Sequence, residues 1–351
     1  MADRPVIYRW AILLAAGLAG CAAPAARRQQ PPPPAPVAVQ PLPAPGTVSA
    51  GVLARDETFV IYRAKPGDTY QSLARRFLDD PGRAWEIAEF AGNDPLTPGA
   101  EVVIPLAPSN PVGVYPDGYQ TVPILCYHRF GDKQAKMVVA PEAFAAQMGY
   151  LADNGYRVIS LSELAEFLAG RRALPRKTVV ITMDDGYRSN YLHAYPELKR
   201  YGFPATIFLY TDFLGGGAAL RPAEMREMVD SGLVDIQPHS KAHSNLALAT
   251  STEDDDAYTR RLSEELETSS NRISDLLGIP IHSFAYPYGD TNQRVIGMLD
   301  RAGYRLGATV QSGGNPAFAP KFLLRRTMVY GDDDLAAFEA KLAVFQRISK
   351  P

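Results

Sequence analysis

The stretch Thr178-Val-Val-Ile-Thr-Met-Asp-Asp-Gly186 decides the fold class of this chain. Its first six residues are almost all β-branched or apolar, which is typical of a strand buried on both faces of a parallel sheet. Two carboxylates, Asp184 and Asp185, follow where this strand is expected to end. Because buried carboxylates need a cation or another partner, the stretch predicts a core strand that ends in a functional site.

Strand-like and helix-like stretches alternate on both sides of this segment. Further strands are expected at 122–127, 157–161, 205–210, 233–237, 283–286, 305–310 and 322–329, and the longest helix at 253–277. Such alternation predicts an α/β fold with a parallel sheet or a (β/α) barrel. In barrels of this kind the functional residues follow the C-terminal ends of strands, so the strand ends are the positions to inspect.

Two other strand ends carry candidate functional residues. His239-Ser-Lys-Ala-His243 follows the strand at 233–237, and two histidines four residues apart on one helical turn can bind one metal ion. Phe284-Ala-Tyr-Pro-Tyr-Gly289 follows a third strand. Each motif alone has an ordinary explanation, since Asp-Asp-Gly is also a common surface turn. Their positions after three strands of one alternating domain favour a shared site.

These motifs together resemble those of the NodB-type polysaccharide deacetylases, carbohydrate esterase family 4, over most of residues 120–310. The resemblance implies a deformed (β/α) barrel that removes acetyl groups from N-acetylglucosamine polymers with a divalent metal, most often Zn²⁺. It also implies that Asp184 is the general base and that the backbone N–H of Tyr288 helps to form the oxyanion hole. The metal ligands that it implies are Asp185, His239 and His243.

The residue types at these positions favour the same chemistry independently of the family resemblance. Two imidazoles and one carboxylate leave an open coordination position for water and substrate. The ion would polarise the acetyl carbonyl and lower the pKa of its water towards ~7, and the second carboxylate would take the proton. A general acid is still required, because an amine anion is a very poor leaving group.

The chain departs from the commonest family pattern at two positions. That pattern takes its acid from a late Leu-x-His, but no histidine follows His282, and Ala285 replaces the arginine that orients the base. His128 follows Leu125-Cys-Tyr at the first strand end, and a Leu-x-x-His with Ala for Arg resembles the circularly permuted subgroup that acts on poly-N-acetylglucosamine exopolysaccharide. We interpret His128 as the general acid; a core histidine that closes the barrel is the alternative.

Several other residues have simpler interpretations. Arg325 and Arg326 are candidates to replace the missing arginine. His193 is expected on a helix as a surface or packing residue, and Cys126 as a small core residue. The acidic run at 253–256 is expected to favour the start of the long helix rather than to bind metal.

The N-terminal region predicts an exported, anchored protein. Residues 1–21 combine Arg4 and Arg9 with a short apolar run and end in Leu-Ala-Gly-Cys21, which resembles a lipoprotein signal peptide with its lipobox. The resemblance implies a lipid anchor at Cys21, and Ala22 after it implies the outer membrane. We therefore expect an extracytoplasmic, lipid-anchored protein that faces the periplasm. Residues 22–58 are Pro-rich and are expected to form an extended tether.

A small module is expected between this tether and the catalytic domain. Residues 59–106 read as strand, helix, helix and strand, with Gly67-Asp-Thr early and Leu96-Thr-Pro-Gly late, and resemble a LysM domain that binds N-acetylglucosamine glycans. Residues 107–119 would be a linker, and 120–351 the deacetylase domain. The LysM module points to peptidoglycan as substrate, whereas His128 and Ala285 point to exopolysaccharide.

Composition excludes other classes. Lys+Arg 36 against Asp+Glu 38, a net charge of −2, argues against nucleic acid as a partner, and two cysteines exclude a disulfide scaffold.

Two rival functions stay open. One is a non-catalytic, cell-wall glycan-binding lipoprotein with a degenerate deacetylase domain. The other is a non-haem iron oxygenase with the same two-His-one-carboxylate triad, which the alternating pattern disfavours.

Overall fold

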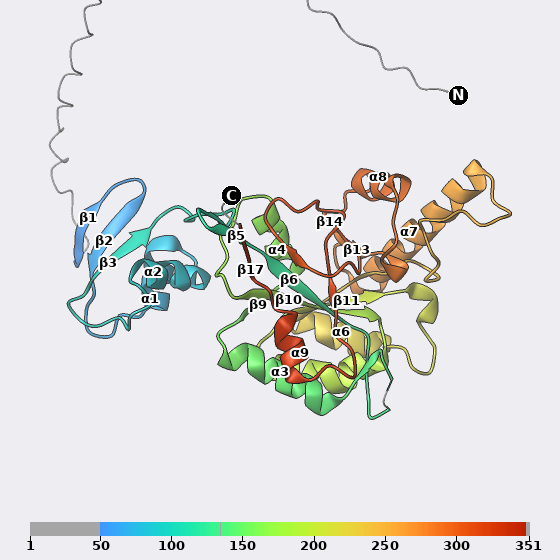
Figure 1. Cartoon of the computed structure of the whole chain (residues 1–351), viewed down its shortest axis with the longest axis horizontal. Coiled ribbons are helices and arrows are strands. Elements are labelled where there is room, and N and C mark those ends of the chain that lie inside the picture. Colours follow the sequence, from blue (N-terminus) through green and yellow to red (C-terminus); the bar gives the residue numbers. More distant parts are fainter. Residues whose placement is uncertain (1–49, 134, 349–351) are drawn as a thin grey trace, which may run out of the picture. The chain divides into compact units, whose positions relative to one another are not determined.

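The computed structural model describes residues 50–133 and 135–348 (Figure 1). The predicted signal peptide, the lipid anchor at Cys21 and most of the Pro-rich tether lie outside these residues. No helix in the described part of the chain is both long and apolar enough to cross a bilayer.

The N-terminal folded part is a three-stranded antiparallel sheet with two helices. Its elements are β1 (Val52–Arg55), β2 (Phe59–Arg63), α1 (Tyr70–Leu78), η1 (Pro81–Arg83), α2 (Ala84–Phe90) and β3 (Glu101–Pro105), and the sheet order is β1-β2-β3. Val60 and Tyr62 of β2 are buried while their neighbours are exposed, as a half-buried strand requires. Thr69 begins α1 with a capping box. β1 lies within residues 22–58, for which the sequence predicts an extended tether. Its four residues show no apolar alternation and therefore give no strand signal.

The larger part is built on parallel strands. They are β6 (Val122–Tyr127), β9 (Arg157–Ile159), β10 (Thr178–Asp185), β11 (Ala205–Leu209), β12 (Val234–Pro238), β13 (Ser283–Ala285), β14 (Leu306–Ala308) and β16 (Thr327–Met328). The main sheet runs β12-β11-β10-β6, with β16 parallel to β6 and β15 (Gly314–Asn315) antiparallel to it. β13 and β14 form a separate parallel pair. Several strands are shorter than expected, most clearly β16 within 322–329.

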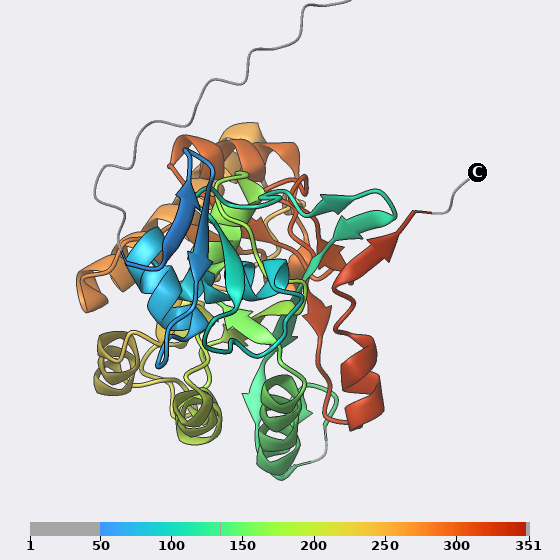
Figure 2. The same ribbon diagram turned by 90° about the vertical axis from the view of Figure 1, so that its left-hand side faces the viewer.

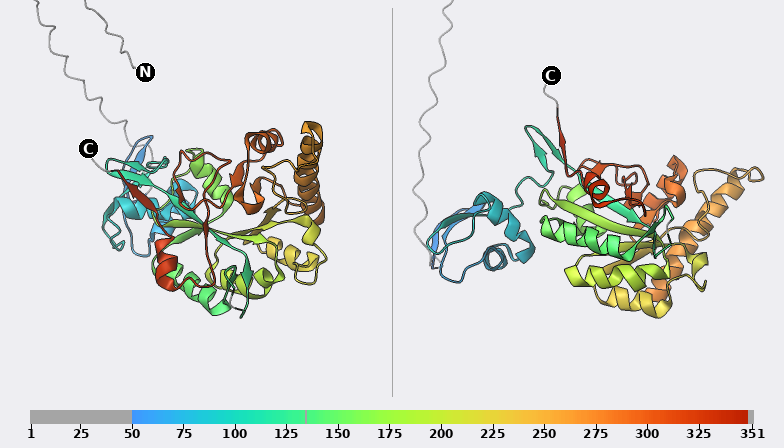
Figure 3. Two further views of the ribbon diagram at one scale, coloured as in Figure 1. Left: turned by 45° about the vertical axis from the view of Figure 1, so that its right-hand side comes forward. Right: turned by 60° about the horizontal axis from the view of Figure 1, so that its bottom comes forward.

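Helices cover the outside of these strands (Figures 1 and 3), and Figure 2 shows several of them end-on. They are α3 (Pro141–Asp153), α4 (Leu161–Leu168), α5 (Tyr195–Tyr201), α6 (Pro222–Asp230), α7 (Asp255–Leu277), α8 (Gln293–Arg301) and α9 (Leu335–Ala340). The acidic run at 253–256 marks the start of α7, where Asp254 caps the helix by accepting the N–H of Ala257. This is the structural role expected for the run.

A side chain completes the ring of strands where the backbone ladder is interrupted. Gln237 of β12 is fully buried; its Nε2 donates to the Pro280 carbonyl at 3.1 Å, and its Oε1 accepts the N–H groups of His282 and Ser283. On the other side, Ala308 of β14 pairs with Leu324, just before β16. The strands thus follow one another around a barrel, but one junction is made by a glutamine. This is the sense in which the expected (β/α) barrel is deformed.

The two-residue alternation of β10 decides what faces the barrel interior. Val179, Ile181 and Met183 pack in the cluster that contains residues of α3, α5 and α6, whereas Val180 packs in a second cluster with β6 and α4. Because alternate side chains of a strand point to opposite faces, Asp184 lies on the same face as Val180. Its exposed fraction is 1%. A carboxylate is therefore carried into the barrel interior and needs a partner there.

Candidate active site

The carboxyl ends of β10 and β12 bring the predicted metal ligands together. One ligand atom from each of Asp185, His239 and His243 lies within 4.8 Å of the others. The Nε2 atom of His243 is 3.4 Å from Asp185 Oδ1, and that of His239 is 3.9 Å from the same oxygen. Asp185 Oδ1 is buried and accepts no hydrogen bond from the described residues. An unpaired buried carboxylate oxygen facing two imidazoles fits a divalent cation.

Without a cation, burial favours the neutral form of all three groups, and for the two histidines this is the form that binds a metal. Burial, and next the charge of Asp184, raises the pKa of Asp185 to about 6, and burial lowers the pKa of His239 to about 4. Burial also lowers the pKa of His243. Neutral imidazoles keep the lone pairs that bind metals.

A tight turn positions the carboxylate of Asp185. Asp185 and Gly186 both have left-handed backbone conformations, with φ of 70° and 78°. A Cβ atom on Gly186 would lie 2.2 Å from Leu209 Cδ1, so a side chain there would have to displace the buried Leu209 and adopt a strained backbone, which favours glycine. The Asp-Asp-Gly motif is therefore a built turn at the end of a buried strand.

The segment from His239 to His243 is not the helical turn that was expected. Ser240 and His243 have φ values of 71° and 57°, which a helix does not allow, and the segment is a loop. The rings still meet, with centroids 4.8 Å apart. Two left-handed residues fold the loop back, so proximity comes from loop geometry and not from helical spacing.

Buried Glu265 of α7 holds this loop in shape. Its Oε2 accepts the backbone N–H groups of Lys241 and Ala242, both at 2.9 Å, and its Oε1 accepts the Ser244 hydroxyl at 2.8 Å. Glu265 is not among the predicted site residues. The signal was its place on the buried stripe of α7, three residues after Leu262, where a charge needs a polar partner.

We expect Glu265→Ala to weaken metal binding roughly 10–100-fold, because two loop N–H groups lose their acceptor and the histidines are no longer held. Glu265→Gln should keep most of the affinity, since its amide oxygen can still accept both. Titration of the metal-free protein with Zn²⁺ measures the effect. The matched control is Glu267→Ala, an exposed position on the same helix. Equal affinities for the Glu265→Ala and Glu267→Ala variants would rule out this positioning role.

The backbone carbonyl of Ala285 orients the ring of His239. His239 Nδ1 lies 2.8 Å from the Ala285 oxygen, so the protonated Nδ1 donates to it and Nε2 faces Asp185. A carbonyl is present whatever the side chain, so this partner leaves no trace in the sequence.

Arg326 forms a buried ion pair with Asp184. Its terminal nitrogens lie 2.6 and 2.8 Å from the two carboxylate oxygens, and its Nε donates to the Thr309 carbonyl. Its exposed fraction is 0%. Burial opposes the charge of Asp184, but Arg326 outweighs this and holds the pKa of that carboxyl well below its usual range. Of the two arginines considered as a substitute at this site, Arg326 contacts Asp184, whereas Arg325 is exposed and donates to the Ser312 carbonyl.

His128 lies beside this ion pair. A ring nitrogen of His128, Cys126 Sγ and a carboxylate oxygen of Asp184 all lie within 4.8 Å of one another. His128 Nδ1 is buried and makes no hydrogen bond to the described residues. Burial raises the pKa of the Cys126 thiol well above its usual value, so it stays protonated, 3.5 Å from Asp184 Oδ2. Cys126 is thus a small core residue, as expected, that also contacts the candidate base.

Tyr288 approaches the site from η4 (Pro287–Gly289). It has a left-handed φ of 61°, and its ring, 60% exposed, packs edge-on against His243 with centroids 4.8 Å apart. The structure therefore gathers all six predicted site residues around the ends of β6, β10, β12 and β13. His193 and His282 lie apart from them: His193 is in η2 (Asn190–Ala194), and His282 pairs with Asp235.

Comparison with known proteins shows the family to which the chain belongs. The family described as "Polysaccharide deacetylase" matches residues 171–307. YxkH of Bacillus subtilis (strain 168), which carries the name of a polysaccharide deacetylase, is 30% identical over 219 residues, 62% of this chain and 75% of its own length. The poly-beta-1,6-N-acetyl-D-glucosamine N-deacetylase of Staphylococcus epidermidis is 26% identical, over 58% of this chain and 72% of that protein. The Escherichia coli K12 enzyme of the same name is 25% identical, but the alignment spans 34% of its length.

Solved structures share the fold. The Streptococcus pyogenes deacetylase PplD in complex with acetate has a TM-score of 0.58 and 25% identity, over 64% of this chain and 99% of that one. IcaB from Ammonifex degensii has a TM-score of 0.56 and 26% identity, over 64% and 97%. The barrel and its strand-end residues thus define an α/β enzyme that processes carbohydrate. The chain belongs to the polysaccharide deacetylase family.

Proposed function

We propose that this protein is a metal-dependent hydrolase that removes N-acetyl groups from an N-acetylglucosamine polysaccharide. The observation that carries the proposal is the convergence of Asp185, His239 and His243 on one point beside an Asp184 that is paired with Arg326. The relatives named as poly-beta-1,6-N-acetyl-D-glucosamine N-deacetylases favour an exopolysaccharide substrate. Peptidoglycan is the second candidate, favoured by the small module at 59–106.

Asp185, His239 and His243 would hold the metal ion, with Zn²⁺ the first choice for two nitrogen ligands and one oxygen ligand. When bound, such an ion polarises the acetyl carbonyl and acidifies a water molecule, so that a base weaker than usual can take its proton. Asp184 is such a base, since Arg326 keeps it ionised at neutral pH and holds its oxygens in place.

The remaining steps use groups of this chain. Asp184 accepts the proton of the water that attacks the acetyl carbon. His128 donates a proton to the amide nitrogen as the C–N bond breaks, so the products are acetate and a free amine. The backbone N–H of Tyr288 would donate to the developing oxyanion. Arg326, buried against Asp184, is a positioning residue. It takes the place of the arginine that the commonest family pattern has where this chain has Ala285.

We infer the cellular setting from the N-terminal motifs. Cleavage before Cys21 and its lipidation would anchor the protein at the outer membrane, facing the periplasm, with the Pro-rich segment as tether. The βααβ core at 59–106 would act as a LysM module that holds the glycan; its element order supports this. The rival function is glycan binding by a degenerate deacetylase domain. It is disfavoured because Arg326 supplies the positive charge beside Asp184 that was lost with the arginine at position 285.

The test is amine release by the full-length chain from N-acetylglucosamine pentamers with β-1,6 or β-1,4 linkage. Zn²⁺-loaded protein should be active, chelated protein inactive, and restored Zn²⁺ should restore turnover. Asp184→Asn should lower kcat on the order of 10²–10⁴-fold, because it removes the base. Turnover that survives both chelation and Asp184→Asn would refute the mechanism. Folded, metal-bound protein that releases no amine from either linkage would favour the glycan-binding alternative.

A further inference from the structure

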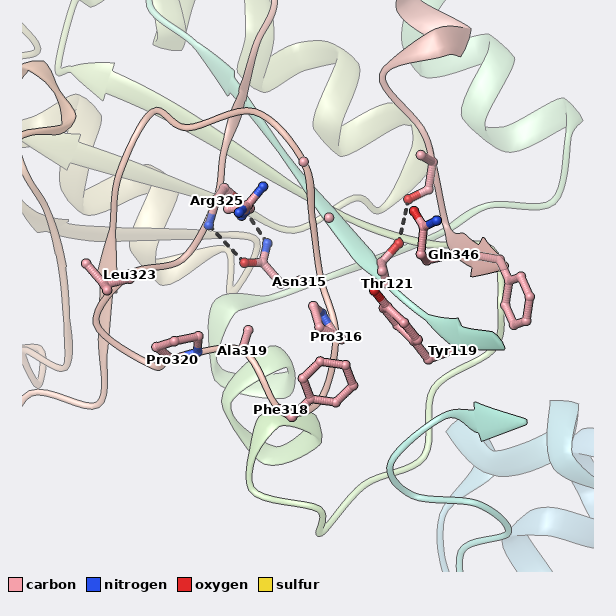
Figure 4. Close-up of a pocket in the computed structure, with 14 residues that line it drawn as sticks. Tyr119, Thr121, Asn315, Pro316, Phe318, Ala319, Pro320, Leu323, Arg325 and Gln346 are labelled. Atoms are coloured by element: carbon pink, nitrogen blue, oxygen red, sulfur yellow. Dashed lines mark hydrogen bonds between the residues drawn. The ribbon is translucent and has the colours of Figure 1, made fainter. Parts of the chain in front are cut away.

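A hollow of about 450 Å³ lies at the opposite end of β6 from the candidate active site. Figure 4 shows it between β5 (Gly118–Gln120), the segment that precedes β17 (Phe345–Arg347), and the loop from Gly313 to Arg325. Thr121, which lines the hollow, precedes β6, and His128 follows β6. The six residues of β6 lie between them, and seven steps of extended chain span roughly 20 Å. A ligand in the hollow therefore contacts different residues from one at the metal ligands.

Two aromatic rings form one wall of the hollow. Tyr119 and Phe318 meet edge-to-face, with centroids 5.1 Å apart. The exposed fraction of Phe318 is 63%, and among the described residues this is one of the most exposed large apolar side chains. Leu323, 41% exposed, lines the hollow as well. Exposed apolar groups that gather in one concave place indicate a binding surface. Aromatic rings suit the flat C–H faces of pyranose rings, since both surfaces are apolar while their edges are polar.

Polar groups with unused hydrogen-bonding capacity surround this wall. Gln346 lies directly opposite Tyr119 in the β5–β17 register, so their side chains share one face. Among the described residues, its side-chain amide makes one hydrogen bond, to the Arg347 carbonyl. Within the same residues, the guanidinium of Arg325 makes one hydrogen bond, to the Ser312 carbonyl at 3.4 Å. Asn315 is different: its amide is used up by Val122 and Arg325 and fixes the shape of the loop.

The charge of the hollow favours one form of ligand. Among the described residues that line it, Arg325 is the one charged side chain, and no carboxylate in this part of the chain forms an ion pair with it. A glycan that carries free amines is cationic, so the unpaired positive charge of Arg325 would repel it. An acetylated glycan is neutral and offers amide oxygens that a guanidinium can bind.

We propose that this hollow is a second glycan-binding site, specific for uncharged, N-acetylated stretches of the polysaccharide. The proposal rests on the proposed function for the class of ligand. Because it lies away from the metal ligands, the site would hold one stretch of a polymer while another is deacetylated. It would release the chain as its acetyl groups are lost, and so direct the enzyme to unreacted polymer.

The test compares the full-length wild type with Phe318→Ala, Arg325→Glu and, as control, Leu335→Ala, which removes an exposed apolar side chain outside the hollow. Binding of acetylated and chemically deacetylated poly-N-acetylglucosamine is measured on chelated protein, which prevents turnover. Phe318→Ala should bind the acetylated polymer roughly threefold to tenfold more weakly, and the control should not change. Arg325→Glu should shift the preference towards the deacetylated polymer.

Turnover of the pentamer separates this proposal from the proposed function. The hollow and the active site lie at opposite ends of β6, so we expect a pentamer bound at the active site not to contact the hollow. Phe318→Ala should therefore leave its kcat and KM unchanged while KM for the polymer rises. Unchanged polymer binding in Phe318→Ala, or an equal loss on pentamer and polymer, would overturn the second site. A peptide of residues 31–46 that displaces polymer from wild type, but not from Phe318→Ala, would assign the hollow to the chain's own Pro-rich segment instead. Inactive wild type that retains these binding differences would contradict the proposed function alone.

Discussion

Arg326→Met is expected to lower kcat roughly 10–100-fold and to lower the free energy of unfolding by about 3–5 kcal/mol. Both effects have one cause. Arg326 is fully buried and contacts both oxygens of Asp184, so its removal leaves an ionised carboxylate unpaired in the barrel interior. Without Arg326, the Asp184 carboxylate would lose the cation that keeps it ionised and the pair of hydrogen bonds that fixes its orientation. Denaturant unfolding and amine release by the same preparation measure the two effects.

A second substitution separates stability from catalysis. Asp184→Asn combined with Arg326→Met removes the charge of both partners, so most of the lost stability should return while the enzyme stays inactive. Arg325→Met, one position earlier and exposed, is the matched control and should change neither the free energy of unfolding nor kcat for the pentamer. Arg326→Lys should not rescue kcat, since an ammonium group cannot make the two parallel contacts. Full activity in Arg326→Met would show that Asp184 needs no orienting cation.

His128→Ala is expected to lower kcat for the N-acetylated pentamer on the order of 10²–10⁴-fold while the metal content stays unchanged. The ring of His128 lies with Asp184 and Cys126, outside the cluster of Asp185, His239 and His243. It can therefore protonate a leaving amine without taking part in metal binding. Amine release and elemental analysis of the purified variant measure the two quantities.

An activated ester distinguishes an acid from a structural residue. The leaving group of p-nitrophenyl acetate needs no proton, so His128→Ala should hydrolyse it at close to the wild-type rate. A distorted site would lose both activities together. His282→Ala, whose ring pairs with Asp235 away from the site, is the control and should retain turnover of the pentamer. Loss of the metal in His128→Ala would instead make His128 part of the metal site.

Local patterns determined the strands and where to look for function. The run before Asp184 reads as a buried strand because its residues are all β-branched or apolar, as in a strand covered on both faces. Parallel strands end at one edge of a sheet, so motifs that follow such strands meet in space even when they are far apart in the chain. The approach of His128 to Asp184 follows from the same rule, since β6 and β10 are neighbours in register.

Only the tertiary structure decided which groups support these residues. Arg326 and Asp184 are 142 positions apart, and no local pattern distinguishes Arg326 from Arg325. Both residues lie in the chain between the bridge at Leu324 and β16, and the packing of this segment against β6 and β14 buries Arg326 and leaves Arg325 exposed. The loop of His239 and His243 looked helical by spacing, yet Glu265 and two left-handed residues shape it. These contacts depend on how distant elements pack, and that information is spread over the whole chain.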